Sequence, residues 1–128
     1  MNLAALRIIT DDVDRLVAFY ERVAGIAARR LAPVFAEITT DTGTLAIAAT
    51  ATAPGWTTPA ANRSVVVDLR VADVDAEYAR LRPLIGEPVQ EPTLMPWGNR
   101  SLLFRDPDGT LVNLFTPVTP EALARQRS

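Results

Sequence analysis

The first half of the chain opens with an apolar run and then changes to helical spacing. Residues 3–10 are mostly apolar and predict a β-strand. Asp11 or Asp12 then stands where a short side-chain oxygen can cap the first turn of a helix. Apolar side chains follow at helical spacing and predict the face that meets a core, namely Val13, Leu16, Val17, Tyr20 and Ala24. Gly25 fits a left-handed helix end, and the pattern then predicts strands over residues 30–39 and 44–50.

The second half shows the same order. Residues 65–71 alternate strictly, with every odd position apolar, which predicts a strand with one face on a helix. Asp73 is placed to cap a helix whose core face we expect to be Val74, Tyr78, Leu81 and Ile85. Residues 99–105 and 110–116 predict a hairpin around the turn sequence of residues 106–109. A short C-terminal helix is expected to begin at residues 119–121, with Pro120 in its first turn.

These two halves are copies of one unit. Asp12-Val13-Asp14 recurs as Asp73-Val74-Asp75, and in each copy a glycine follows 13 residues after the first Asp. Gly43-Thr44-Leu45 likewise recurs as Gly109-Thr110-Leu111. A repeated unit too small to bury its own face predicts that both copies build one structure. We therefore expect residues 1–128 to form a single domain of two modules, about 3–50 and 64–118, joined by a Thr-, Ala- and Pro-rich linker.

Composition narrows the function. A net charge of −2 without a basic block argues against a nucleic-acid partner. No apolar run approaches the roughly 20 residues that span a bilayer, and we expect a cytoplasmic protein without a membrane partner. The chain contains no His, no Cys and no Lys, so imidazole, thiolate and amine chemistry are all missing.

The motifs resemble those of the vicinal oxygen chelate superfamily, which includes glyoxalases, extradiol dioxygenases, fosfomycin-resistance enzymes and bleomycin-binding proteins. The resemblance covers residues 3 to about 118. It rests on Asp12-Val13-Asp14 leading to Phe19-Tyr20 and Gly25, and on residues 96–100 (Pro-Trp-Gly-Asn-Arg) leading to residues 104–109 (Phe-Arg-Asp-Pro-Asp-Gly). It implies an α+β fold of tandem βαβββ modules, with their mixed sheets curled into a cup and the helices on the outer face. It also implies a homodimer.

Metal-dependent members of the family place His and Glu ligands on the first and last strands of each module. Carried over to this chain, these positions fall on Ala5, Ile47, Val66 and Asn113. None of the four is a usual ligand for Zn, Fe or Mn. We therefore expect no metal site and no cofactor.

The resemblance and strand alternation together predict what lines the cup. Starting from an inward-facing Asn113, alternation and pairing across the 106–109 turn add Phe115, Arg100, Leu102 and Phe104. The first strands contribute Arg7, Val66, Asp68 and Arg70, the first module adds Ala36, Ile38, Leu45 and Ile47, and Trp56 and Trp97 stand in loops as flat walls. Such a mostly apolar lining is typical of a small-molecule pocket.

Several of these residues also have a structural interpretation. For Arg7, Asp68 and Arg70, ion pairs where the first strands meet are favoured over a catalytic role, whereas for Arg100 contact with a ligand and support of the turn fit equally. Either tryptophan fits a ligand wall or plain packing.

The leading functional hypothesis is a metal-independent protein that binds a small aromatic molecule and sequesters it, as the bleomycin-binding branch sequesters an antibiotic. The ligand would be an aromatic natural product or antibiotic, and the outcome self-resistance. The alternative is a cofactor-free lyase or isomerase of this superfamily that uses Asp68 as a base. The sequence leaves open whether any chemistry is performed.

Overall fold

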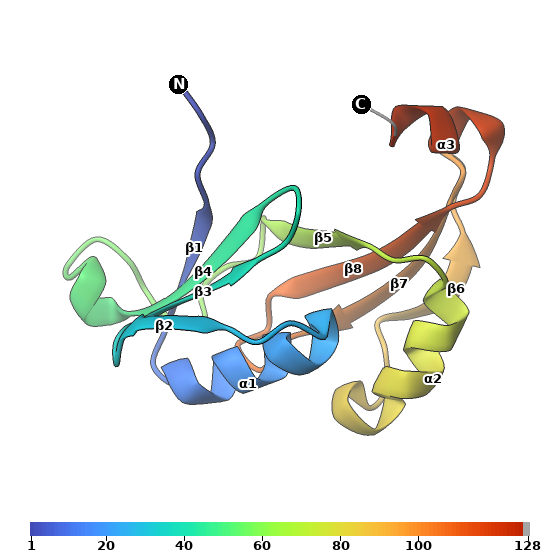
Figure 1. The fold of residues 1–128 in the computed structure, drawn as a ribbon. Coiled ribbons are helices and arrows are strands. Elements are labelled where there is room, and N and C mark those ends of the chain that lie inside the picture. Colours follow the sequence, from blue (N-terminus) through green and yellow to red (C-terminus); the bar gives the residue numbers. More distant parts are fainter. Residues whose placement is uncertain (127–128) are drawn as a thin grey trace. The chain divides into compact units, whose positions relative to one another are not determined.

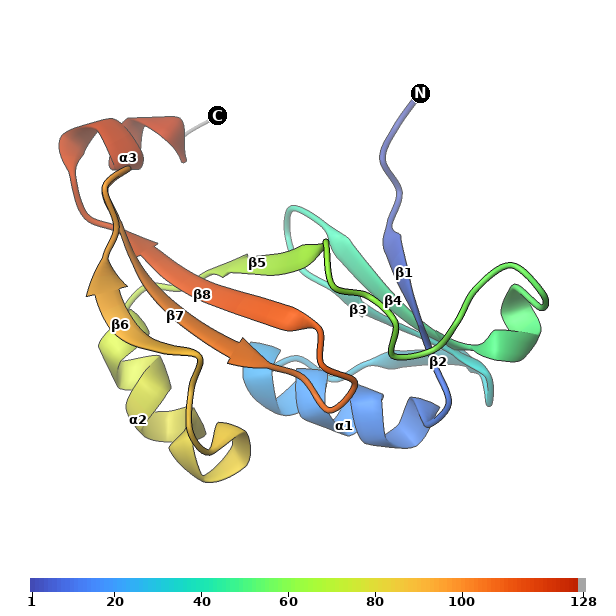
Figure 2. The ribbon, with the colours of Figure 1, turned by 180° about the vertical axis from the view of Figure 1, so that it is seen from behind.

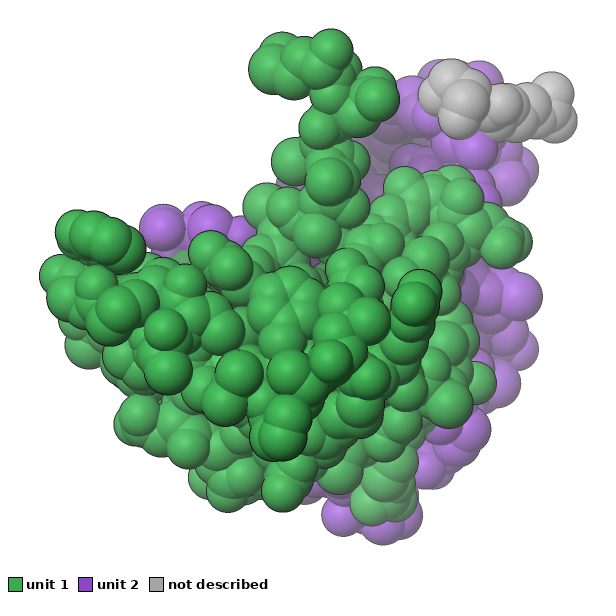
Figure 3. Space-filling view, turned by 60° about the vertical axis from the view of Figure 1, so that its left-hand side comes forward, with its two compact units in different colours: residues 1–62, 107–109 green, residues 63–106, 110–128 purple. Residues whose placement is uncertain are grey.

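The computed structural model describes residues 1–126, and within them the chain divides into two compact units. Unit 1 consists of residues 1–62 together with 107–109, and unit 2 of residues 63–106 and the chain from Thr110 onward (Figure 3). Each unit has the same element order of strand, helix and three further strands. The predicted α+β class with duplicated βαβββ units is confirmed.

Unit 1 contains β1 (Leu6–Thr10), α1 (Val13–Ala24), β2 (Arg29–Ala32), β3 (Phe35–Thr39) and β4 (Thr44–Ala49), followed by a short 3₁₀ helix (Thr50–Thr52). Its sheet has the strand order β1-β4-β3-β2, in which β1 is parallel to β4 and the other pairs are antiparallel (Figure 1). The single strand predicted for residues 30–39 is two strands. A turn after Ala32 reverses the chain, so that Ala32 pairs with Phe35.

Unit 2 contains β5 (Val66–Arg70), α2 (Val74–Ile85), β6 (Gln90–Leu94), β7 (Asn99–Arg105) and β8 (Leu111–Pro117), and then α3 (Pro120–Arg125). Its strand order, β5-β8-β7-β6, is that of unit 1, again with the first strand parallel to the last (Figure 2). The resemblance implied a third strand after α2, but the sequence pattern did not place β6. Its sequence, Gln-Glu-Pro-Thr-Leu, lacks apolar alternation, and it is an edge strand, where a proline is tolerated.

The helix boundaries follow the sequence closely. Asp12 accepts a hydrogen bond from the amide of Arg15, and Asp73 accepts from the amides of Asp75 and Ala76, so both predicted N-caps are confirmed. Gly25 ends α1 at φ 68°, a conformation that other L-residues rarely adopt. In α3, Thr119 caps the helix through the amide of Ala122, and Pro120 occupies its first turn as expected.

Each sheet has two different faces. In unit 1 the side chain of Arg30 reaches Asp14 on α1, which places the row Arg30, Ala36 and Ile47 on the face that α1 covers. In unit 2, Arg100 reaches Asp75 on α2 and so marks the face that α2 covers. We call these the helix-covered faces, and the opposite face of each sheet its distal face.

Candidate functional site

The turn between β7 and β8 decides which side chains reach the distal face of unit 2. Residues 106–109 were predicted to form this turn, but the loop closes one residue later. Thr110 is buried, its amide donates to Asp106 Oδ1, and its carbonyl accepts from the Asp106 amide. Arg105 therefore pairs with Leu111, and Leu103 pairs with Asn113.

Because of this one-residue difference, the side chains of β7 face the opposite way from the prediction. Arg100, Leu102 and Phe104 were expected to face the same side as Asn113, and that prediction is wrong. Leu102 and Phe104 are 0% and 1% exposed and belong to the core on the helix-covered face. A shift of one residue in register moves every side chain of a strand to the other face.

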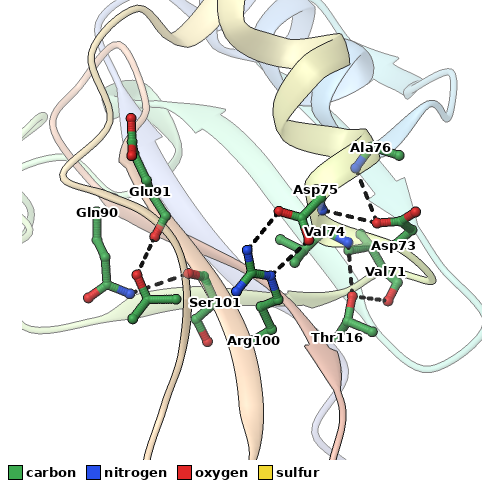
Figure 4. Close-up of polar contacts among 11 residues, drawn as sticks. Val71, Asp73, Val74, Asp75, Ala76, Gln90, Glu91, Arg100, Ser101 and Thr116 are labelled. Atoms are coloured by element: carbon green, nitrogen blue, oxygen red, sulfur yellow. Dashed lines mark hydrogen bonds and ion pairs between the residues drawn. The ribbon is translucent and has the colours of Figure 1, made fainter.

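Arg100 is engaged on that helix-covered face. Its Nε and Nη2 donate to the two carboxylate oxygens of Asp75 at 2.8 and 2.9 Å (Figure 4). The hydrogen bond from Arg100 holds the pKa of the Asp75 carboxyl below its ordinary value and raises the pKa of Arg100. Arg100 thus contacts helix α2, and its side chain lies on the face opposite Asn113.

The same correction applies in unit 1. The hairpin of unit 1 pairs Thr39 with Thr44. Ile47, which stands four residues after the turn glycine Gly43, therefore lies on the helix-covered face and not on the distal face. Ile47 is 0% exposed and lies on the face that α1 covers, together with Ala36 and Ile38. Leu45 pairs with Ile38 and shares this face. The position of β4 that matches Asn113 is Ala46, because Ala46 pairs with Arg7 as Asn113 pairs with Asp68.

The distal face of unit 2 retains the other predicted residues of that unit's sheet. Register places Val66, Asp68 and Arg70 of β5 on this face beside Leu111, Asn113 and Phe115 of β8. On β7 the matching side chains are Asn99, Ser101, Leu103 and Arg105, none of which was predicted. Arg7 lies on the distal face of unit 1, and Ala5 precedes β1.

The centre of this face is polar. Asn113 Nδ2 donates to Asp68 Oδ1 at 2.9 Å, a contact between neighbouring parallel strands. Arg70 Nη1 donates to the carbonyl oxygen of Gln126, the residue that ends α3, at 3.0 Å. Both contacts lie inside unit 2.

Three polar atoms of this face are buried without a hydrogen-bond partner among residues 1–126. They are Asn99 Oδ1, Ser101 Oγ and Asn113 Oδ1. Ser101 as a whole is 2% exposed. Most buried polar groups in folded proteins are hydrogen-bonded, so three such atoms on one face are an exception that a bound ligand or water would remove. Alternation would have identified Ser101 and Asn99 had the turn length been known.

One end of the face is closed by α3 and by the loop that holds Trp97. In Figures 1 and 2, α2 and α3 lie on opposite sides of the unit 2 strands. A Cβ on Gly98, which has φ +94°, would stand 2.1 Å from Thr119 Oγ1, so glycine is required here. Arg125 donates to the carbonyl oxygen of Trp97 and ties this loop to α3. The Trp97 side chain is 55% exposed, whereas Trp56, in the linker of unit 1, is 85% exposed.

The residues at the family's metal positions do not fit a metal. After the correction in unit 1, these positions carry Ala5, Ala46, Val66 and Asn113, of which only Asn113 has a side-chain oxygen. In the described part of the chain, no three His, Cys, Asp or Glu side chains gather closely enough to hold a metal ion. Transition-metal sites need such ligands in convergent geometry.

Comparison with known proteins identifies the family. The model of the Glyoxalase/Bleomycin resistance protein/Dioxygenase superfamily matches residues 2–114. The chain belongs to this superfamily. None of its helices within residues 1–126 has the length and apolar character needed to cross a membrane.

Solved structures agree with this assignment. A conserved domain protein is 28% identical, with a TM-score of 0.73 over 91% of this chain and 99% of that chain. TioX from Micromonospora sp. ML1 is 25% identical, with a TM-score of 0.70 over 92% of this chain and 100% of that one. A glyoxalase/bleomycin resistance protein/dioxygenase from Nocardioides, 24% identical, has a TM-score of 0.74 over 94% of this chain and 85% of its own, which shows the shared fold alone. No curated protein matches the chain.

Proposed function

We propose that this protein is a metal-independent binding protein for a small aromatic molecule, and that unit 2 provides the binding surface. The observation that carries the proposal is the distal face of unit 2. It combines buried, unpartnered polar atoms with apolar side chains from β5 and β8. Pockets for small molecules have this composition, in which a few placed polar groups orient a ligand on an apolar lining.

The side chains at the family's metal-ligand positions favour a binding function over metal-dependent chemistry. Family members that activate substrate through a metal use ligands at positions that hold Ala5, Ala46 and Val66 here. Alanine and valine offer no donor atom, so no step through a metal is derived for this chain. A binding role needs only shape, a flat wall and a few hydrogen bonds.

Trp97 is the better candidate for the flat wall. Its loop is held in place by the contact of Arg125 with its carbonyl oxygen and by the packing of Gly98 against α3. A wall fixed in this way loses little entropy when a ligand stacks on it. Trp56 lies in the linker, in the other unit. Phe115 supplies a second aromatic side chain on the distal face.

The second candidate function is a cofactor-free lyase or isomerase with Asp68 as its base. It is favoured by one contact, the 2.9 Å hydrogen bond that orients the Asp68 carboxylate through Asn113. A base needs a fixed carboxylate near the substrate proton. Sequestration remains the first choice because the chain has no His, Cys or Lys, so that acid–base chemistry would depend on Asp68 and few other groups.

Titration of intrinsic Trp fluorescence with a panel of aromatic natural products tests the proposal. Stacking contributes on the order of 1 kcal/mol beyond burial, so Trp97→Ala should weaken binding about tenfold, whereas Trp97→Phe should retain most of it. Trp56→Ala is the matched control in unit 1 and should bind like the parent. Mass spectrometry of the recovered ligand should show it unchanged. A ligand whose mass or configuration changes would instead support the lyase or isomerase.

The biological role we propose is self-resistance through sequestration, in a homodimer. Expression in a sensitive host should raise the inhibitory concentration of an antibiotic that the protein binds, and Trp97→Ala should reduce the protection. Light scattering should give twice the chain mass of 13.9 kDa. A monomer at micromolar concentration would contradict the dimer without affecting the binding proposal.

A further inference from the structure

We propose that the unit 2 face recognises its ligand through the ligand's hydrogen-bond donors, so that the preferred molecule carries an amide N–H, an amine or a hydroxyl beside its aromatic ring. This inference rests on the proposed binding function and names the chemical class of the ligand.

The orientation of the Asn113 amide is fixed by its neighbour. Asp68 is an acceptor when ionised, so the amide must turn its nitrogen toward Asp68 Oδ1, as it does at 2.9 Å. Turning the amide over would place two oxygens against each other. Asn113 Oδ1 therefore points away from Asp68, is buried, and has no hydrogen-bond partner within residues 1–126. A carbonyl oxygen in this position is an acceptor that a donor on a ligand can satisfy.

Ser101 provides a second, independent group. Ser101 pairs with Phe115, and Asn113 with Leu103, so the two polar side chains sit in adjacent rows of one face. Ser101 is 98% buried, since it is 2% exposed, and its hydroxyl has no partner in the described chain. Asn99 Oδ1, one row further along β7, is also buried and has no hydrogen-bond partner among the described residues. By register, the row of Ser101 lies between the row of Asn113 and that of Asn99.

Two of the arginines of unit 2 already make contacts within the unit. Arg100 is on the helix-covered face with both of its donating nitrogens on Asp75. Arg70 donates through Nη1 to the carbonyl oxygen of Gln126. The charged group in contact with the Asn113 side chain is the Asp68 carboxylate, which repels an anion and favours a neutral or cationic donor.

Three matched probes separate donors from acceptors on one ring system: naphthalene carboxamide, its N,N-dimethyl derivative and naphthalene carboxylate. The carboxamide carries N–H donors, the dimethyl amide keeps only the carbonyl, and the carboxylate is an anion. A site built to hydrogen-bond a donor discriminates strongly against analogues that lack it, because its own polar groups are then left unpaired. We expect the carboxamide to bind at least about tenfold more tightly than either of the others in fluorescence and NMR titrations.

Variants of Asn113 and Ser101 test whether these residues cause the preference for the carboxamide. Asn113→Leu should bring the ratio between carboxamide and dimethyl amide close to one, and Ser101→Ala should reduce it. Ser101→Ala should also leave the melting temperature of the ligand-free protein unchanged or higher, because it removes a buried hydroxyl that has no partner. The control is Thr93→Val on β6. Thr93 pairs with Ser101, but its exposed hydroxyl already donates to the Glu91 carbonyl oxygen at 2.7 Å. This variant should keep the probe preference and gain no stability.

The outcomes are distinct. Equal binding of all three probes, or tighter binding of the carboxylate, overturns the donor inference and leaves the aromatic-binding function standing. Binding of none of the three at millimolar concentration removes the proposed function and the inference together. A clear drop in the melting temperature of ligand-free Ser101→Ala means that the hydroxyl has a structural partner, which overturns the role of Ser101. A preference that persists in folded Asn113→Leu overturns the role of Asn113.

Discussion

The two units share strand order and register but hold their helices in different ways. Helix α1 buries six apolar side chains, whereas α2, of the same length, buries only Val74 and Leu81 and contains Pro83 in its last turn. The attachment of α2 is supplemented by polar contacts. In each unit an arginine of the sheet contacts the helix, Arg30 with Asp14 and Arg100 with Asp75. In unit 2, Thr116 also accepts from the Val74 amide and donates to the Val71 carbonyl oxygen (Figure 4). The helix of unit 1 therefore relies more on apolar burial, and that of unit 2 more on polar contacts.

The distal faces differ in a matching way. The row of unit 1 that contains Arg7 and Ala46 corresponds to the row of unit 2 that contains Asp68 and Asn113. Ala46 is buried and has no polar side-chain atom, whereas Asn113 and Ser101 bring buried, unpartnered atoms to unit 2. Leaving such atoms unpaired costs stability, which a binding site can recover when its ligand supplies the partner. This is why we assign binding to unit 2.

The largest expected effect is on the apolar attachment of α1. Leu16 is fully buried, and Leu16→Ala should lower the free energy of unfolding by about 3 kcal/mol, through lost burial and the cavity left behind. Urea unfolding followed by circular dichroism measures it. Leu31→Ala on β2, an exposed position, is the control and should change stability by less than about 0.5 kcal/mol. A cost for Leu16→Ala as small as that of Leu31→Ala would break the comparison.

A smaller effect is expected for the polar attachment of α2. Thr116→Val retains the shape but removes both hydrogen bonds, leaving the Val74 amide and the Val71 carbonyl oxygen without this partner. The expected loss is about 1 to 2 kcal/mol, measured in the same way. Thr39→Val removes an exposed hydroxyl of unit 1 that contacts Thr44 and serves as the control. If both threonine variants behave alike, polar contacts do not distinguish the units.

The Asp75–Arg100 pair should give a weaker effect that depends on pH. Its hydrogen bond lowers the folded-state pKa of Asp75 below the ordinary value of 3.8. Because the folded pKa is the lower one, the contribution is present above the unfolded-state pKa and is lost as pH falls through the folded-state pKa. Both side chains are exposed, so the effect should be small and screened by salt.

The measurement compares thermal unfolding of the parent and Asp75→Asn between neutral and strongly acidic pH. The variant should be less stable at neutral pH, and the difference should shrink below the ordinary carboxyl pKa. Arg100→Gln should remove the same pH-dependent component. A stability difference that grows as the pH falls would contradict the assigned direction of the pKa shift.

Removal of metal ions is expected to have no effect on stability or binding. Neither unit offers His or Glu at the family's ligand positions, so dialysis against EDTA should leave the melting temperature and aromatic-probe binding unchanged. Elemental analysis of the purified protein should find no stoichiometric Zn, Fe, Mn or Ni. A content of about one metal ion per chain that is lost in Asn113→Ala would contradict this prediction. It would show that unit 2, unlike unit 1, has a metal site.

The sequence by itself determined the features that depend on near neighbours. The Asp12 and Asp73 caps, the left-handed Gly25 and the alternation of β5 each involve residues close together in the chain, and all were predicted. The duplicated motifs determined the α+β fold, because a repeated pattern implies a repeated unit. The polarity of β5, with Asp68 and Arg70 facing away from the helix, was also predicted correctly.

Only the tertiary structure decided which side chains share a face. One additional residue in the β7–β8 loop moved Arg100, Leu102 and Phe104 to the helix-covered face and brought Ser101 and Asn99 beside Asn113. The period of a strand is two residues, so an error of one in a turn inverts the whole strand. The partners of Arg70 and Arg100, Gln126 and Asp75, lie 56 and 25 residues away in the chain. Contacts at such separations are fixed by packing, and no local pattern in the sequence specifies them.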